Sequence, residues 1–224
     1  MQFHVSEEYL MDYAAGTASE AVSLLVATHL ALCPECRAKV ADYERIGGAM
    51  LEDSRPADLP DAALAAMLAR LDEVPADAPD EMPVKAPAVV EFDEHTRRIL
   101  PEPLRSYIGC NLDTAPWRNV TKALQEIELP LGESGYRTRL YRIKGGQAMP
   151  NHTHGGNEMT LVLAGGFSDD TGHYERGDVS IADDELVHTP VADPGEDCIC
   201  LAVTDAPLKL TGPIGRIVNL FMRY

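Results

Sequence analysis

Hydrophobic residues in the first third of the chain recur at steps of three and four, the spacing of helices that bury one face. Ser6, followed by two glutamates, is placed to begin a first helix that Gly16 ends. The stripe of a second helix consists of Val22, Leu25, Val26, His29, Leu30 and Cys33. Pro34 suits the first position of a third helix. One face of that helix carries Cys36, Val40, Tyr43, Gly47 and Met50 or Leu51. These patterns predict a small all-α bundle.

A fourth helix is predicted over residues 61–72, with alanines on much of its surface. Its hydrophobic stripe consists of Leu64, Met67, Leu68 and Leu71. The stretch EVPADAPDEMPVKAPAVVEFDEH that follows is rich in Pro, Ala and acidic residues and has little periodicity, which is typical of a linker. We therefore predict a helical domain over residues 1–75 and a linker over residues 76–91.

From residue 92 onward the pattern changes to one of strands. The segments YRTRLYRI and CICLAV alternate or are rich in β-branched residues, and the clusters KGGQ, AGGFSDDTG and YERGD are typical of turns. Many short strands at this spacing indicate a barrel or a sandwich. The predicted fold class is α + β in two domains, a small all-α bundle followed by an all-β domain over residues 92–224.

Charge narrows the classes of partner. The chain has 36 acidic and 19 basic residues and a formal net charge of −17, which argues against direct binding of nucleic acid and is compatible with a basic protein surface. The first residues, MQFHVSEEYLMDY, lack the pattern of an export signal, and the apolar stretch AVSLLVATHLALC is shorter than the roughly 20 residues that a bilayer requires. The five cysteines, an odd number in a chain without an export signal, do not suggest a disulfide framework. We expect a cytoplasmic protein without a membrane span.

The segment CPEC could be a redox dithiol, a disulfide staple or half of a metal site. A thioredoxin-type dithiol follows a strand, whereas here a helix precedes Cys33 and carries His29 four residues earlier, on the same face. Cys33 at the end of one helix and Cys36 in the first turn of the next place both sulfurs at one corner. The pattern therefore favours a metal site.

A fourth ligand is needed to complete a tetrahedral site. His4 is the only other His or Cys in the first 90 residues, although Asp12 or Glu35 could reach the metal instead. With His4, the set His₂Cys₂ is a typical ligand set of structural zinc.

The β domain contains a second group of candidate ligands. His152 and His154 share one face of a strand because side chains alternate along it, and Glu158 follows on the next strand. The spacing from Gly146 to Gly165, G-x5-H-x-H-x3-E-x6-G, resembles the first cupin motif, and Gly177-Asp178 followed by His188 resembles the second. The resemblance implies a cupin barrel. A site of three His and one carboxylate suits Zn²⁺ or another divalent transition metal.

The whole chain is similar to the ChrR group of zinc-binding anti-sigma factors. The segments YAAGT, ATHLALCPECR and CICLAVTDAPL carry the resemblance, together with the two ligand patterns. It implies that His4, His29, Cys33 and Cys36 bind zinc, and that the helical domain inhibits an extracytoplasmic-function sigma factor by blocking its access to RNA polymerase. It also implies that the fourth helix meets the sigma factor; the alternative is that this helix packs on its own bundle.

In that family the cupin domain is needed to release the sigma factor in response to reactive oxygen such as singlet oxygen. The route could be chemical damage or metal loss at either site, or binding of an oxidised small molecule at the cupin metal. Two further hypotheses remain open at this point. One is a metal-dependent cupin enzyme, such as a dioxygenase, that the zinc domain docks to a partner, and the other is a thiol redox enzyme at Cys33 and Cys36.

Overall fold

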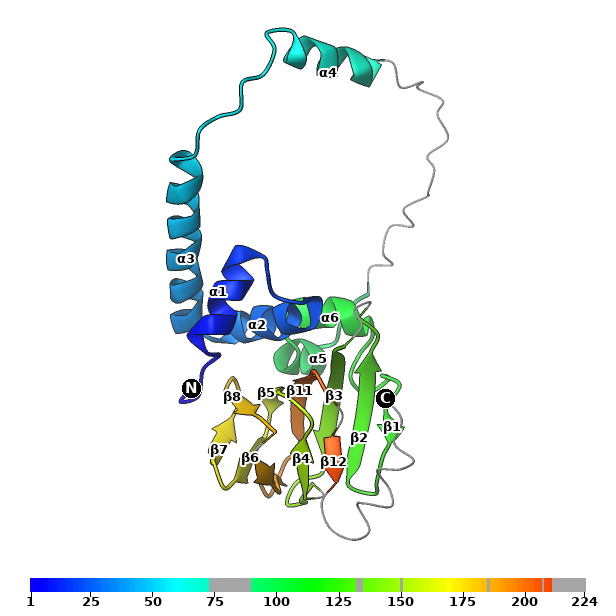
Figure 1. Ribbon diagram of the computed structural model, residues 1–224. Coiled ribbons are helices and arrows are strands. Elements are labelled where there is room, and N and C mark those ends of the chain that lie inside the picture. Colours follow the sequence, from blue (N-terminus) through cyan, green and yellow to red (C-terminus); the bar gives the residue numbers. More distant parts are fainter. Residues whose placement is uncertain (73–89, 132–134, 150, 185, 207, 211–224) are drawn as a thin grey trace.

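A computed structural model describes residues 1–72, 90–131, 135–149, 151–184, 186–206 and 208–210. A helical part lies at one end of a β part (Figure 1). The helices are α1 (Glu7–Ala15), α2 (Glu20–Leu32), α3 (Pro34–Glu52), α4 (Ala63–Asp72), α5 (Glu94–Ile99) and α6 (Glu102–Ile108). The strands are β1 (Arg118–Asn119), β2 (Leu124–Leu129), β3 (Arg137–Ile143), β4 (His152–His154), β5 (Glu158–Ala164), β6 (Gly166–Asp169), β7 (Gly172–Glu175), β8 (Val179–Ala182), β9 (Val187–His188), β10 (Val191–Ala192), β11 (Cys198–Thr204) and β12 (Leu208–Leu210).

The ends of the first three helices follow from local sequence. Ser6 precedes α1, and Gly16 ends it with φ of 69°, a left-handed conformation that glycine adopts without strain. At the start of α2 the Ser19 hydroxyl accepts a hydrogen bond from the backbone N–H of Val22 at 3.2 Å. Cys33 ends α2 and also caps α3, which begins at Pro34 as predicted.

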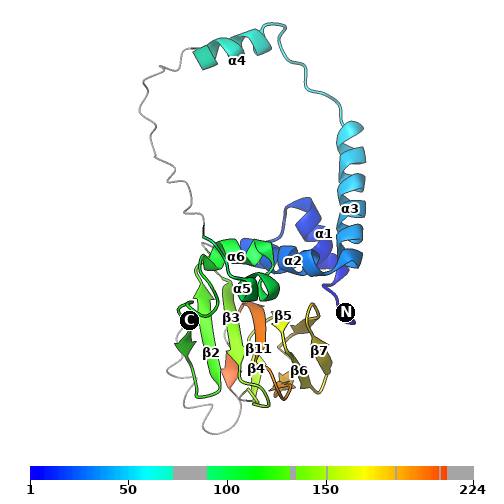
Figure 2. The same cartoon turned by 180° about the vertical axis from the view of Figure 1, so that it is seen from behind.

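α2 is buried on almost every side. Its predicted stripe is buried, but so are Ala21, Leu24 and Thr28, which lie off that stripe. The reason is that α2 lies between two layers, with α1 and α3 on one side and α6 and the sheet strand β11 on the other (Figures 1 and 2). One hydrophobic core extends from α2 into the β part, and its residues include Leu25, Val26, Leu100, Leu104, Leu163 and Leu201. The helices and the sheet therefore stabilise each other.

The two short helices α5 and α6 lie where only β structure was predicted. Asp93 caps α5 by accepting the Thr96 N–H at 2.6 Å, and Gly109, with φ of 66°, ends α6. Each helix has fewer than eight residues, which is too short for a periodic hydrophobic pattern to be read from sequence. α6 lies beside α2 and packs against it, and α5 lies between these two helices and the sheet, so both join the helical part to the β part (Figure 2).

α4 and the second half of α3 extend away from the rest of the molecule (Figures 1 and 2). The buried residues of α3 are Cys36 and Val40, in its first half; Tyr43 is half-buried, and Ile46, Met50 and Leu51 beyond it are exposed. On α4, Leu64, Met67 and Leu68 are 64%, 61% and 50% exposed. The side chain of Leu71 lies outside the described part of the chain. The fourth helix therefore does not complete the bundle in the isolated chain.

The strands form three antiparallel sheets. The largest has the order β1-β2-β3-β11-β5-β8, and the smaller ones are β10-β6-β7 and β12-β4-β9. All seven residues of the central strand β11 are buried. The arrangement agrees with the predicted all-β domain. The predicted linker, residues 76–91, lies outside the described residues except for its last two.

Among the described residues, no single helix has the length and apolar composition needed to cross a membrane. The one pair of helices that passes that test jointly, α1 with α2, is bent by 108°.

Candidate metal centres

Four side chains from the helical part converge at the junction of α2 and α3. One ligand atom from each of His4, His29, Cys33 and Cys36 lies within 4.8 Å of the other three. His4 Nδ1 is 3.4 Å from both cysteine sulfurs. These are the four residues that the sequence predicts as a His₂Cys₂ set. Of the two alternatives for the fourth ligand, Asp12 instead accepts a hydrogen bond from Thr17, at 3.0 Å.

The junction between the two helices brings the sulfurs together. Cys33 has φ of −108° and ψ of 104°, so the chain leaves α2 in an extended conformation before α3 starts at Pro34. The Cys33 sulfur accepts the backbone N–H of Cys36 at 3.4 Å, which places both sulfurs at the positive end of α3. That position favours thiolates and therefore a bound cation.

His29 is oriented for metal binding. Its Nδ1 lies 2.9 Å from the carbonyl oxygen of Gly177, which can only accept, so Nδ1 carries the proton and Nε2 has the free lone pair. Among the described residues, Nε2 is buried without a hydrogen-bond partner. A buried acceptor left without a partner is costly unless something binds it. A metal ion held by Nε2 accounts for this arrangement, because metal-bound histidines commonly donate their other N–H to a carbonyl or a carboxylate.

The protonation of the cysteine and histidine side chains in this cluster depends on whether a cation is bound. Burial, and then the neighbouring Cys33, raise the pKa of Cys36 to about 12. Burial lowers the pKa of His29, although the bond to Gly177 opposes this. Without a metal, the Cys36 thiol and the His29 imidazole are therefore both neutral. A divalent cation would stabilise the thiolate and occupy the imidazole lone pair. Glu35 Oε2, 3.6 Å from His4 Nε2, adds a carboxylate beside the cluster.

The second cluster lies inside the β part. His152 on β4 is the register partner of His188 on β9, and their ring centres are 4.6 Å apart. Glu158, the first residue of β5, lines the same small cavity as these two histidines. Three of the four predicted cupin ligands therefore converge. His154 belongs to β4, but its side chain lies outside the described part of the chain, so its place in the site stays a prediction.

Asp169 supports this cluster, and sequence reasoning missed it. Its carboxylate is fully buried and lies 2.8 Å from His188 Nδ1. Burial opposes ionisation of Asp169, but hydrogen bonds from Thr171 and His188 outweigh it and hold the pKa below its usual range. A carboxylate behind a histidine fixes the ring and makes it a more basic metal ligand. Asp169 falls outside both cupin motifs, so no spacing rule indicates it.

The cavity that His152, Glu158 and His188 line is small. Its volume is about 30 Å³, whereas sites for organic substrates occupy about 300–1,000 Å³. Burial raises the pKa of Glu158 to about 7, although Thr160 and Arg139 oppose the shift. A carboxyl and two histidines that line a space of this size suit a metal ion with little room for a further ligand.

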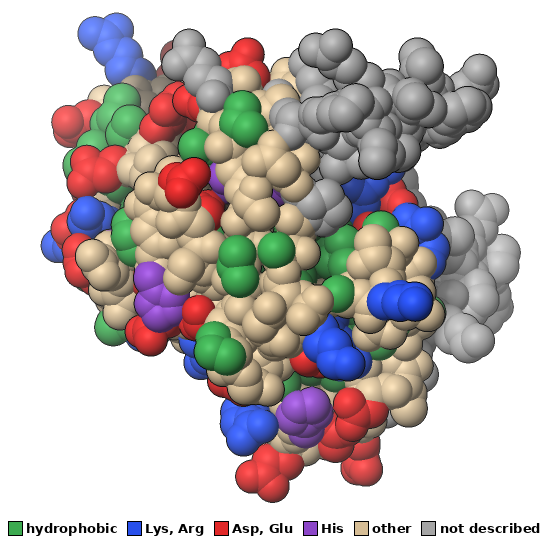
Figure 3. All heavy atoms as spheres, turned by 90° about the horizontal axis from the view of Figure 1, so that it is seen from below, with side chains coloured by type: hydrophobic (Ala, Val, Ile, Leu, Met, Phe, Trp, Pro, Cys, Tyr) green, Lys and Arg blue, Asp and Glu red, His purple; other side chains and the backbone are tan. Residues whose placement is uncertain are grey.

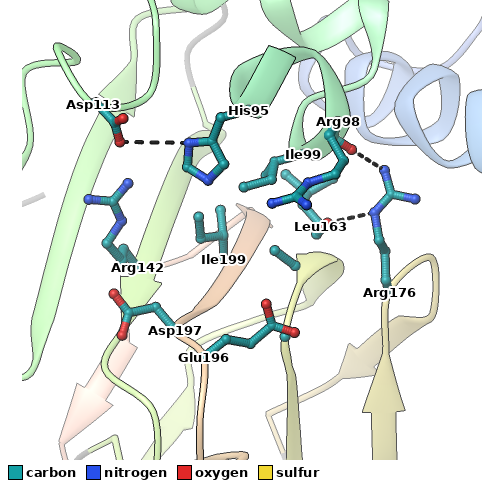
Figure 4. Close-up of a pocket in the computed structure, with 12 residues that line it drawn as sticks. His95, Arg98, Ile99, Asp113, Arg142, Leu163, Arg176, Glu196, Asp197 and Ile199 are labelled. Carbon is teal, nitrogen blue, oxygen red and sulfur yellow. Dashed lines mark hydrogen bonds and ion pairs between the residues drawn. The ribbon is translucent and has the colours of Figure 1, made fainter. Parts of the chain in front are cut away.

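A larger cavity, of about 500 Å³, lies elsewhere, between α5 and the ends of β5 and β11. Figure 4 shows Glu196 and Asp197 on one side of it and His95 and Arg98 on the other. None of the predicted site residues lines this cavity. Its charges have both signs, which defines no single class of ligand. Arg176 crosses its edge and donates to the carbonyls of Leu163 and Arg98 at 2.8 and 2.7 Å, so it ties α5 to the sheet.

The end of the β part that faces away from the helices is mixed in character where its described residues are visible. Figure 3 shows acidic and basic side chains around this face and isolated hydrophobic ones across it, over the area that grey atoms leave visible. His173, which lies outside both cupin motifs, is exposed and pairs with Asp193 at 2.8 Å. Cys198 and Cys200 are buried in β11.

The fold and its two clusters define a two-domain protein, in which a helical zinc domain is joined to a cupin domain. The family of the ChrR cupin-like domain matches residues 105–207, and a zinc-finger family matches residues 5–37. The chain is 44% identical to the anti-sigma-E factor ChrR of Cereibacter sphaeroides over 223 residues, which cover 100% of this chain and 99% of that protein. The crystal structure of Rhodobacter sphaeroides SigE in complex with the anti-sigma ChrR matches with 43% identity and a TM-score of 0.74, over 92% of this chain and 100% of that one.

This chain therefore belongs to the ChrR family of anti-sigma factors. The membership confirms the predicted family and places the chain among regulators of transcription rather than enzymes. The zinc-finger match and the His₂Cys₂ cluster assign zinc binding to the helical domain.

Proposed function

We propose that this protein is a cytoplasmic anti-sigma factor that binds and inhibits an extracytoplasmic-function sigma factor through its helical domain. Its family membership supports the inhibitory role. The matching ChrR structure was solved with SigE bound, which supports a sigma factor as the partner. The net charge of −17 suits a basic partner surface, because opposite potentials steer the encounter.

The observation that carries this proposal is the exposed hydrophobic surface on α3 and α4. It consists of Ile46, Met50 and Leu51 on α3 and Leu64, Met67 and Leu68 on α4, each at least half exposed. α3 and α4 follow each other in the sequence, and clusters of exposed large hydrophobic side chains on a soluble protein mark sites of interaction. We name these six residues the open helical surface. A sigma factor seated on it would bury them and would fix the position of α4.

Zinc at His4, His29, Cys33 and Cys36 would hold α2 and α3 at the angle that presents this surface. Zinc at a closed tetrahedral site is structural rather than catalytic. α3 begins at Pro34, inside the cluster, so its direction depends on the geometry there. Loss of the metal would free α3 and would weaken inhibition.

The cupin cluster is proposed as a second metal site with a role in release. His152, Glu158 and His188 would bind Zn²⁺ or another divalent transition metal, with His154 as the predicted fourth ligand. Oxidative stress of the singlet-oxygen type would act through this site or through oxidisable Cys, His and Met side chains to favour the released state. The small cavity weighs against the alternative of a cupin enzyme, because an organic substrate does not fit in about 30 Å³.

A pull-down with the full-length chain tests the proposal. Tagged protein with its zinc bound is incubated with lysate of the source organism and with purified candidate sigma factors. We expect one sigma factor to be retained, and to be lost when a chelator strips the zinc cluster. A folded, zinc-loaded chain that retains none of them would refute the anti-sigma role.

A further inference from the structure

The β7–β8 turn of the cupin domain reaches into the helical domain. This segment, residues 175–179, is named the clamp turn. The Gly177 carbonyl accepts the hydrogen bond from His29 described above, at 2.9 Å. Gly177 has φ of 95°, a backbone conformation that strains any residue with a Cβ, so glycine is favoured here. The cupin domain thus fixes which nitrogen of His29 faces the zinc cluster.

The same turn holds the segment that carries the second histidine. Asp178 Oδ1 accepts the backbone N–H groups of Gln2 and Phe3 at 2.7 and 3.1 Å, and the Val179 N–H donates to the Phe3 carbonyl at 3.1 Å. Asp178 is buried, and its other oxygen accepts the Glu175 N–H at 3.0 Å. His4 follows Phe3 directly. Two of the four predicted zinc ligands are therefore positioned by one turn of another domain.

A chain of contacts joins this turn to the cupin cluster. The Phe3 ring lies 4.5 Å from the ring of Tyr174. The Tyr174 hydroxyl is 2.8 Å from Thr171 Oγ1, which donates to Asp169, the partner of His188. Each link is a direct contact, although Thr171, in the middle of the chain, is itself exposed. These contacts form a path from His188 to the residue before His4.

We propose that the clamp turn is part of the zinc site: it positions His4 and His29, and through Tyr174 and Asp169 it makes their position depend on the cupin ligand His188. Asp178 and Tyr174 are positioning residues, since neither touches the metal. The inference rests on the zinc ligands proposed above. It gives the cupin domain a route by which a change at its own site weakens the zinc site.

Cobalt substitution of the full-length chain tests the first part of the proposal, that the clamp turn positions His4 and His29. Cys33 and Cys36 thiolates give Co²⁺ an intense charge-transfer absorption that a site of His and Glu does not give, so the titration reports the zinc cluster alone. We expect Asp178→Ala to weaken cobalt binding by about 10–100-fold, the usual effect of losing a group behind a metal ligand. The matched control is Asp170→Ala, an exposed aspartate in the nearby β6–β7 turn, which should change affinity by less than about twofold.

Asp178→Asn replaces Asp178→Ala in this titration if the latter does not fold, because it keeps the size of the side chain but replaces the charged carboxylate that accepts the Gln2 and Phe3 N–H groups. Unchanged cobalt affinity in the folded variants would overturn the clamp alone. Absence of the thiolate absorption in the wild-type chain would overturn the zinc ligands and the clamp with them.

A double-mutant cycle tests the second part of the proposal, that the zinc site depends on the cupin ligand His188. We expect His188→Ala to lower cobalt affinity at the zinc cluster by about fivefold or more, within the usual range of coupling between sites. In a Tyr174→Phe background, which lacks only the hydroxyl that contacts Thr171, this effect should largely disappear. Additive effects, or no effect of His188→Ala, would overturn the coupling.

Discussion

The sharpest prediction concerns the hydrophobic residues of α4. The double variant Leu64→Ala/Leu68→Ala removes two side chains from the open helical surface, while Ala keeps the helix because its helix propensity is at least that of Leu. In the free chain these residues are 64% and 50% exposed and α4 lies apart from the rest of the molecule. We therefore expect binding of the sigma factor to weaken while the fold stays intact.

The size of the effect follows from the exposed fractions. Each substitution removes three carbons, worth about 2.4 kcal/mol for a side chain that passes fully from water to an interface. Only the exposed 64% and 50% can be newly buried, which leaves about 1.5 kcal/mol for Leu64 and about 1.2 kcal/mol for Leu68. Together they correspond to a rise in Kd of about 100-fold. The free energy of unfolding should change by less than about 0.5 kcal/mol.

Isothermal titration calorimetry with the purified sigma factor measures Kd, and urea unfolding measures stability. Ile181→Ala is the matched control, because Ile181 is 42% exposed on β8 of the cupin domain, and its Kd should stay within about twofold of wild type. An unchanged Kd for the double variant would refute α4 as a binding surface. A large loss of stability in the free chain would show instead that α4 packs on its own domain.

Three further predictions concern the metal sites. Cys33→Ser should lower Tm by at least about 10 °C and abolish sigma binding, since each kcal/mol lost shifts Tm by about 2–4 °C in a chain of this size. Thermal unfolding followed by circular dichroism measures Tm, and an unaltered Tm would exclude a structural metal. Because the pKa of Glu158 is about 7 in the folded chain against an ordinary 4.5, the contribution of Glu158 to the stability of the metal-free protein should be full below pH 4.5 and should fall by about 3 kcal/mol as pH rises through 7. Urea unfolding at pH 5 and 8 tests this, and Glu158→Gln should remove that part of the pH dependence. His152→Ala and Glu158→Ala should keep inhibition and lose the response to singlet oxygen in a reporter strain, and full induction of either variant would exclude the cupin metal from release.

The zinc cluster could be predicted from sequence because its geometry is local. His29, Cys33 and Cys36 lie within eight residues, and helix periodicity with one Pro places them at one corner. His4 could be predicted because it is the only other His or Cys in the first 90 residues, and the structure places it beside the other three side chains. The partners that hold these ligands could not be predicted. The Gly177 carbonyl reaches His29 across 148 residues of sequence, and a backbone carbonyl carries no residue type to recognise.

In the cupin domain, too, the candidate metal ligands could be predicted from sequence but the residues that support them could not. The spacing of His152, Glu158 and His188 could be read because strand alternation and motif length are local properties. Asp169 could not, since it reaches His188 only after β6 and β9 are placed by the sheets. The burial of α2 on both sides was missed for a related reason. Its second contact surface is formed by α5, α6 and β11, which are distant in sequence.

The position of α3 explains how a small change at the zinc cluster could release a large partner. α3 begins inside the cluster and has 19 residues, so it is about 28 Å long at 1.5 Å per residue. Its first half is packed and its second half bears part of the open helical surface. A tilt of about 10° at the cluster would move the far end by about 5 Å, as much as one helical turn. Packed interfaces do not deform continuously over such distances, so a sigma factor seated on α3 and α4 would be lost rather than loosened. Control of His4 and His29 by the cupin domain would then be sufficient for release, without unfolding of either domain.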